Sequence, residues 1–131
     1  METSAGTGRT GRTVDPGGAG IALSALGRNE EAISCYDKML AIDPNHSDAL
    51  NGKAFALAEL DKNEEALPII ERGLEIAPNT DYVLATAAFI MYNLKRYDQA
   101  KLYYNKALDI NPNLKDTLSE SELKAFNSVM K

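Results

Sequence analysis

Two sequence patterns contain residue types that could take part in chemistry: one is rich in glycine, and the other has adjacent acids. Residues 6–11, GTGRTG, match the G-x-G-x-x-G pattern whose backbone N–H groups bind a dinucleotide pyrophosphate. That pattern works only after a β-strand and at the start of a helix, whereas METSA precedes it here and a glycine-rich segment follows. NEE at 29–31 and 63–65 resembles a carboxylate pair, but acids at helix starts interact favourably with the helix dipole. We therefore expect neither a phosphate loop nor an acid–base pair.

The single histidine and the single cysteine do not form a catalytic set. His46 follows a Pro-Asn pair, and no nucleophile or acid lies at a readable spacing from it, so we interpret it as a surface residue of a connecting segment. Cys35 aligns with Ile69 and Tyr103 of the repeat described below, so a buried thiol is favoured over a reactive one. No Cys/His cluster has zinc spacing. We predict no catalytic, cofactor-binding or metal-binding residue, and no enzyme activity.

The sequence repeats every 34 residues. RNEEAISCYDKMLAIDPN at 28–45 returns as KNEEALPIIERGLEIAPN at 62–79 and as RYDQAKLYYNKALDINPN at 96–113. Small and apolar residues within each copy fall at i, i+4, i+7 and i+8, which is one face of an α-helix. Each copy ends at a proline, which disfavours helix in the preceding residue. Each copy is therefore predicted to be helix, turn, helix, turn, and Ser119 with Glu122 predicts a capping box that begins one more amphipathic helix.

Composition limits the class of protein. The 131 residues suffice for one domain, with 44% hydrophobic and 25% charged residues. The net charge of -5 argues against nucleic acid and anionic membranes as partners. No apolar run approaches the ~20 residues of a membrane span, and one cysteine fits a reducing compartment, so we expect a cytoplasmic protein. Residues 1–18 are glycine-rich and are expected to form a flexible tail, with a single domain at 19–131.

The 34-residue helix–turn–helix period resembles the tetratricopeptide repeat. Small residues recur at the twentieth position (Ala32, Ala66, Ala100) and proline at the thirty-second (Pro44, Pro78, Pro112). The resemblance implies an all-α, right-handed superhelical solenoid of three repeats, at about 13–46, 47–80 and 81–114, and a C-terminal capping helix at about 115–131. The sequence departs from the family pattern at Lys53 and Ala87, where the seventh position usually holds leucine.

The resemblance also implies a function. In proteins of this type the first helix of each repeat lines a concave groove that binds a peptide or helix of a partner protein. Carried over by repeat position, the lining residues are Asp48, Asn51, Phe55, Glu59, Tyr82, Thr86, Phe89, Tyr92 and Asn93. Ile21, Ser24 and Ala25 are the corresponding residues of the first repeat. We therefore expect a non-catalytic scaffold or adaptor.

The chemistry of this lining predicts the chemistry of the partner. One subclass of the family clamps acidic chaperone tails with lysine and arginine, and the clamp positions here include Tyr82 and Thr86 instead. We expect a protein segment with apolar anchors and a basic flank, and no cofactor. An alternative remains open: the chain is part of a larger enzyme or assembly machine. The aromatic residues are then covered by the last helix or by self-association.

Overall fold

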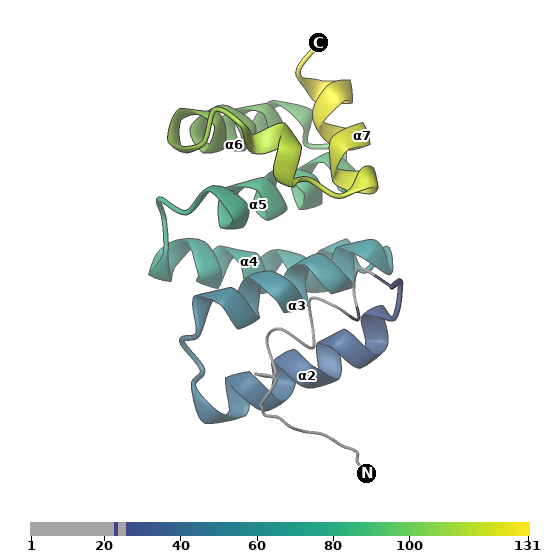
Figure 1. Cartoon of the computed structure of the whole chain (residues 1–131), viewed down its shortest axis with the longest axis vertical. Helices are drawn as coiled ribbons and strands as arrows, with labels where there is room; N and C mark the ends of the chain where they lie inside the picture. Colours follow the sequence, from purple (N-terminus) through teal and green to yellow (C-terminus); the bar gives the residue numbers. More distant parts are fainter. Residues whose placement is uncertain (1–22, 24–25) are drawn as a thin grey trace.

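The computed structural model describes residues 23 and 26–131, and these residues form a stack of helices (Figure 1). They contain six α-helices and one 3₁₀-helix, with no β-strand among them. The elements are α2 (Asn29–Ile42), α3 (Ser47–Glu59), α4 (Asn63–Ile76), α5 (Asp81–Asn93), α6 (Tyr97–Ile110), η1 (Leu114–Thr117) and α7 (Glu120–Val129). The prediction of an all-α helical-repeat solenoid is confirmed.

The second helix of each repeat keeps the 34-residue period. Helices α2, α4 and α6 begin at residues 29, 63 and 97 and end at residues 42, 76 and 110. Glu30, Glu31, Glu64 and Glu65 lie in first turns, as expected of acids that interact with a helix dipole. Pro68 lies inside α4 without ending it. His46 precedes α3 and accepts a hydrogen bond from the Ala49 N–H at 3.2 Å, so this connector residue also caps a helix.

The tight turn inside each repeat has a left-handed residue. Gly27 (φ 76°), Asp61 (φ 62°) and Lys95 (φ 65°) occupy the same repeat position. This conformation costs glycine little and costs residues with a Cβ more, although aspartate tolerates it better than most. Lys95 therefore carries a local backbone strain that Gly27 avoids.

Small residues allow the paired helices to approach closely. Ala32, Ala66 and Ala100 each have 0% of their surface exposed. Four positions later in each repeat, the larger Tyr36, Ile70 and Tyr104 are also buried. Small and large residues thus alternate in the core, so that the large side chains fill the gaps beside closely packed helices. Cys35 is half-buried rather than fully buried.

Helix α7 closes the C-terminal end of the stack. Ser119 accepts from the Glu122 N–H, and the Glu122 side chain accepts from the Ser119 N–H, which confirms the predicted capping box. The Phe126 ring packs edge-on against Tyr104 of α6, with ring centroids 5.0 Å apart. Figure 1 shows α7 running across the direction of α5 and α6 rather than parallel to them. α7 is therefore not in the register of a fourth repeat.

Several sequence predictions concern residues outside the described part of the chain. These are the flexible tail at 1–18, the GTGRTG pattern at 6–11 and most of the first helix of repeat one, including Ile21, Ser24 and Ala25. The described residues begin with Leu23 and continue from Leu26.

Candidate functional site

Helices α3 and α5 place two predicted lining residues in direct contact. Asp48 and Tyr82 occupy the same position in successive repeats, and the Tyr82 hydroxyl donates to Asp48 Oδ1 at 2.5 Å. Both side chains are exposed, Tyr82 at 46%. The hydrogen bond to the Asp48 carboxylate, together with partial burial, raises the pKa of Tyr82 to about 12. Tyr82 is therefore a neutral phenol beside a negative charge at physiological pH.

The predicted aromatic residues are in contact but differ in accessibility. The Phe55 and Phe89 rings, also one repeat apart, have centroids 5.9 Å from each other. Phe55 is half-buried, whereas only 4% of Phe89 is exposed. Phe55 is thus the member of the pair that a partner could contact in this conformation.

Helix α7 accounts for part of the burial at this end of the surface. Ala125 of α7 belongs to the same apolar cluster as Phe89. The Ser121 hydroxyl lies 2.8 Å and 3.1 Å from the two carboxylate oxygens of Glu59 in α3 and donates to them. Helix α7 therefore contacts α3 and α5, the first helices of the second and third repeats. The Glu59 carboxylate accepts a hydrogen bond from within the chain.

The remaining predicted residues make intramolecular contacts. The Thr86 hydroxyl is buried and donates to the Tyr82 carbonyl at 3.0 Å. Tyr92 packs edge-on against Tyr97, with ring centroids 5.6 Å apart. Asn93 Nδ2 donates to Asn63 Oδ1 at 3.0 Å, which ties the end of α5 to the start of α4. Thr86 thus bonds within α5, Tyr92 contacts α6 of the same repeat, and Asn93 joins two repeats.

The accessible part of the predicted lining is smaller than the sequence suggested. We define the α3–α5 surface as Asp48, Asn51, Phe55 and Tyr82, the first three of which share one face of α3. Asn51 Oδ1 is buried and accepts no hydrogen bond from any described residue. The α3–α5 surface thus offers the rings of Phe55 and Tyr82 and the carboxylate of Asp48, with no lysine or arginine, whereas the Asn51 acceptor is not accessible.

One relationship beside this surface was not predicted from sequence. A Cβ at Gly52 would lie 2.2 Å from Cζ of Tyr36, so the tyrosine ring occupies the space of a side chain. Gly52 is therefore a packing residue. The sequence contained a signal for this packing. The large Tyr36 occurs together with Gly52, whereas one repeat later the smaller Ile70 occurs together with Thr86.

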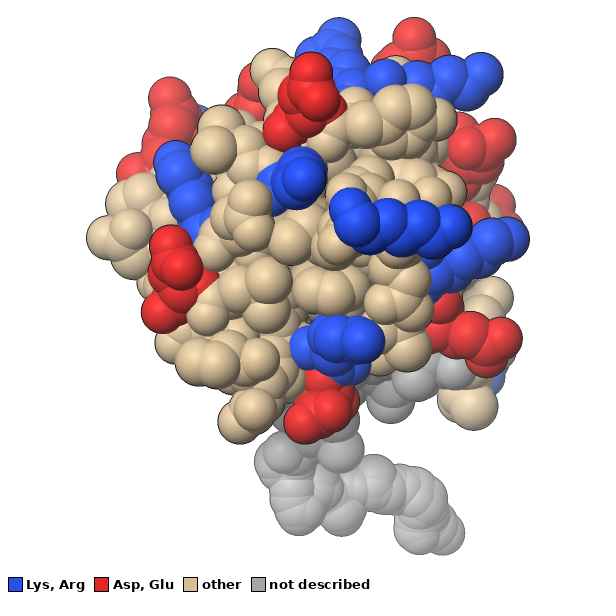
Figure 2. Space-filling view, turned by 90° about the horizontal axis from the view of Figure 1, so that it is seen from above, with Lys and Arg blue, Asp and Glu red and all other residues tan. Residues whose placement is uncertain are grey.

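Charge is distributed unevenly along the stack. Residues 26–93 contain twelve Asp and Glu against five Lys and Arg, whereas residues 94–131 contain five against seven. Figure 2, seen from above, shows several Lys and Arg side chains around an uncharged area at that end of the molecule. The α3–α5 surface lies in the acidic part of the chain, which favours cationic over anionic partners.

The described part of the chain has neither a cluster of metal-ligating side chains nor a helix that could span a membrane. No three His, Cys, Asp or Glu side chains of these residues come together as a metal site would require. None of the helices combines the length and apolar character needed to traverse a bilayer.

Comparisons with known proteins identify the repeat. Residues 23–89 and residues 82–114 match a family described as tetratricopeptide repeat. No curated protein matches the sequence.

Solved structures share the fold. The chain is similar to the first TPR domain of human RPAP3, with a TM-score of 0.73 and 19% identity over 88% of this chain and 87% of that one. It is similar to the second TPR domain of human RPAP3 in complex with the HSP70 peptide SGPTIEEVD (TM-score 0.70, 19% identity, 89% and 93% covered). It is also similar to the first TPR of Spaghetti (RPAP3) bound to the HSP90 peptide SRMEEVD (TM-score 0.72, 19% identity, 88% and 87% covered).

Proposed function

The chain belongs to the tetratricopeptide repeat family, and from this premise we propose that it is a non-catalytic protein-interaction module. Its α3–α5 surface binds a segment of a partner protein that has apolar anchors and a basic flank. The relatives in complex with HSP70 and HSP90 peptides support the general role of a peptide-binding module.

The observation that carries the proposal is the chemistry of the α3–α5 surface. The half-buried Phe55 ring offers an apolar contact, and aromatic side chains supply much of the binding energy at interfaces. Asp48 provides the negative charge that a lysine or arginine would approach.

The same surface disfavours the peptides that the relatives bind. Both SGPTIEEVD and SRMEEVD carry several acids near their C-terminus. An acidic peptide would face Asp48 and would find no cationic donor on the α3–α5 surface to compensate its desolvation. We therefore propose a partner segment with basic residues, in contrast to the acidic peptides of these relatives.

Self-packing is a second use of part of the lining, and one observation favours it. Ser121 is hydrogen-bonded to Glu59, and Ala125 belongs to the apolar cluster that contains Phe89. The Phe89 end of the predicted lining then serves own-chain packing, and the end containing Asp48 and Tyr82 serves the partner. The two uses occupy different parts of α3 and α5.

Peptide-display selection on the immobilised chain tests the proposal. A random twelve-residue library should enrich sequences with two or more large apolar residues and at least one flanking Arg or Lys. The enriched peptides should bind the Asp48→Lys variant at least about tenfold more weakly, because a like charge then faces the flank. Enrichment of acidic sequences, or tighter binding of SRMEEVD than of the basic peptides, would refute the proposal.

A further inference from the structure

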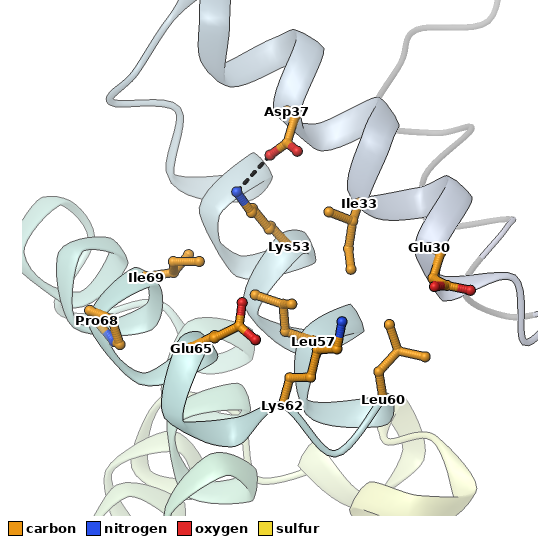
Figure 3. Close-up of a pocket in the computed structure, with 10 residues that line it drawn as sticks. All are labelled: Glu30, Ile33, Asp37, Lys53, Leu57, Leu60, Lys62, Glu65, Pro68 and Ile69. Carbon is orange, nitrogen blue, oxygen red and sulfur yellow. Dashed lines mark ion pairs between the residues drawn. The ribbon is translucent and has the colours of Figure 1, made fainter.

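A second candidate surface lies on a different side of α3. We define the α2–α4 pocket by its lining: Glu30, Ile33, Asp37, Lys53, Leu57, Leu60, Lys62, Glu65, Pro68 and Ile69. Figure 3 shows Ile33 of α2 and Ile69 of α4 on opposite sides, with Leu57 of α3 between them. The pocket has a volume of about 650 Å³ and is largely open to solvent, so it is a shallow groove between helices and not an enclosed cavity.

Two residues of the lining differ from their counterparts in the next repeat. Lys53 stands where the next repeat has Ala87, and its ammonium group pairs with Asp37 of α2 at 2.7 Å. Ile69 stands where the next repeat has the larger Tyr103. Figure 3 shows the Lys53–Asp37 pair at one end of the pocket and Ile69 on one of its sides. The first junction between repeats therefore differs from the second in the side chains that fill it.

The pocket combines an apolar floor with an acidic rim. Leu57 is buried, while Ile33, Leu60 and Ile69 are half-buried, so their side chains still contact solvent. Glu30 and Glu65 are exposed on the two walls, and neither is in an ion pair with another described residue. Lys53 is already neutralised by Asp37, which leaves Lys62 as the remaining cation of the lining. The rim thus has an excess of one negative charge in the most acidic part of the chain.

We infer that the α2–α4 pocket is a second docking site, for an amphipathic helix of a partner protein with two aliphatic side chains one turn apart and a flanking arginine. Aliphatic side chains fit the floor formed by Ile33, Leu57 and Ile69. A guanidinium group fits the exposed carboxylates of Glu30 or Glu65, since it forms charge-assisted hydrogen bonds with carboxylates. A helix is favoured because the pocket lies between two helices, and a helix laid into such a site presents side chains at i and i+4. This site goes beyond the α3–α5 surface and does not depend on it.

Methyl NMR with designed peptides tests the site. The probes are three alanine-based sixteen-residue helical peptides: Leu at i and i+4 with a flanking Arg, the same peptide with Glu for Arg, and the Arg peptide with Ala for Leu. The Leu/Arg peptide should shift the δ1-methyl signals of Ile33 and Ile69 and leave that of Ile110, on α6, unchanged. The other two peptides should bind at least about tenfold more weakly.

Variants taken from the chain's own repeats give the sharpest control. The substitution Ile69→Tyr copies the residue of the next repeat, Tyr103, and should weaken Leu/Arg binding at least about tenfold, because the larger ring would occupy the space of the peptide's leucine side chains. Ile42→Tyr adds a ring on α2 outside the pocket, at a residue that is 87% exposed, and should leave binding unchanged. Asp48→Lys should also leave it unchanged, which separates this site from the proposed function.

Three outcomes would overturn the inference. The first is unchanged binding of the Leu/Arg peptide to a folded Ile69→Tyr variant. The second is equal binding of the Glu-flanked peptide. The third is the same Ile33 and Ile69 shifts on raising the concentration of the chain alone, which would identify a second copy as the occupant. Circular dichroism of each variant establishes that it is folded before binding is compared.

Discussion

The Ser121 hydroxyl of α7 donates a hydrogen bond to Glu59 of α3 at 2.8 Å, across 62 positions of the sequence. The bond joins the last helix to the second repeat rather than only to the third. Because α7 also places Ala125 in the cluster that contains Phe89, the last helix defines where the accessible part of α3 and α5 ends. The position of α7 therefore limits which part of the predicted lining is accessible.

Ser121→Ala should loosen α7 without unfolding the repeats. The bond is exposed and contributes about 1 kcal/mol, so amide exchange in α7 should accelerate about fivefold while exchange in α5 stays constant. Hydrogen-exchange mass spectrometry measures both. Ser128→Ala on the same helix is the matched control, because Ser128 is exposed and makes no side-chain hydrogen bond with a described residue. Equal acceleration in both variants would contradict the role of the Ser121–Glu59 bond.

Glu122→Gln should stabilise the protein at neutral pH. Burial raises the pKa of Glu122 above its ordinary value of 4.5, the Ser119 hydrogen bonds lower it, and the Glu59 charge raises it further. The net shift is upward, so the charged form is disfavoured in the folded state. Glutamine still completes a capping box and has no charge to desolvate. The melting temperature at pH 7 should therefore rise.

The pH dependence of this effect has a definite sign. Since the folded pKa lies above the unfolded one, the folded protein binds more protons in the window between them. The Glu122 contribution to stability is complete below pH 4.5 and is lost as the pH rises through the folded pKa. The gain from Glu122→Gln should be large at pH 7 and should shrink toward pH 4.5. A gain that grows on acidification would show that the carboxylate is stabilising.

Lys95→Gly should raise the free energy of unfolding by about 0.5–1 kcal/mol. Lys95 is exposed and has φ 65°, a left-handed conformation that Gly27 adopts at the same position of the first repeat. Glycine removes the steric cost of the Cβ at such a site. Chemical denaturation measures the change. Lys101→Gly, at an exposed position inside α6, should instead destabilise by about 1 kcal/mol, and a loss at both positions would refute the strain at Lys95.

The 34-residue period made most of the fold predictable. Ala32, Ala66 and Ala100 are buried as their spacing indicated, and the prolines follow the helices that they were expected to end. The period also predicted that Asp48 and Tyr82 occupy the same position in successive repeats, although it did not predict the hydrogen bond between them.

The accessible surface was less predictable, for a physical reason. Helix α7 has no counterpart at an earlier repeat, so no spacing fixed its direction, and its contact with the Phe89 cluster could not be inferred. The lining of the α2–α4 pocket likewise includes Lys53 and Ile69, where the next repeat has Ala87 and Tyr103, and a repeat pattern does not predict such differences.

Gly52→Ala should destabilise the protein, and a second substitution should rescue it. The added Cβ would lie 2.2 Å from Cζ, 2.4 Å from Cε1 and 2.6 Å from Oη of Tyr36. Tyr36 is only 3% exposed, so its ring has little room to move away. Overpacking of this kind costs about 1–3 kcal/mol.

Tyr36→Ile supplies the rescue, because isoleucine (Ile70) occupies this position in the next repeat, where the residue corresponding to Gly52 is Thr86. Tyr36→Ile alone should destabilise, since it leaves space above Gly52. The Gly52→Ala, Tyr36→Ile pair should recover at least about 1 kcal/mol relative to the sum of the single changes, as residues in contact do in double-mutant cycles. Urea denaturation of the four proteins measures the coupling. Additive losses would mean that the Tyr36 ring does not occupy the space above Gly52.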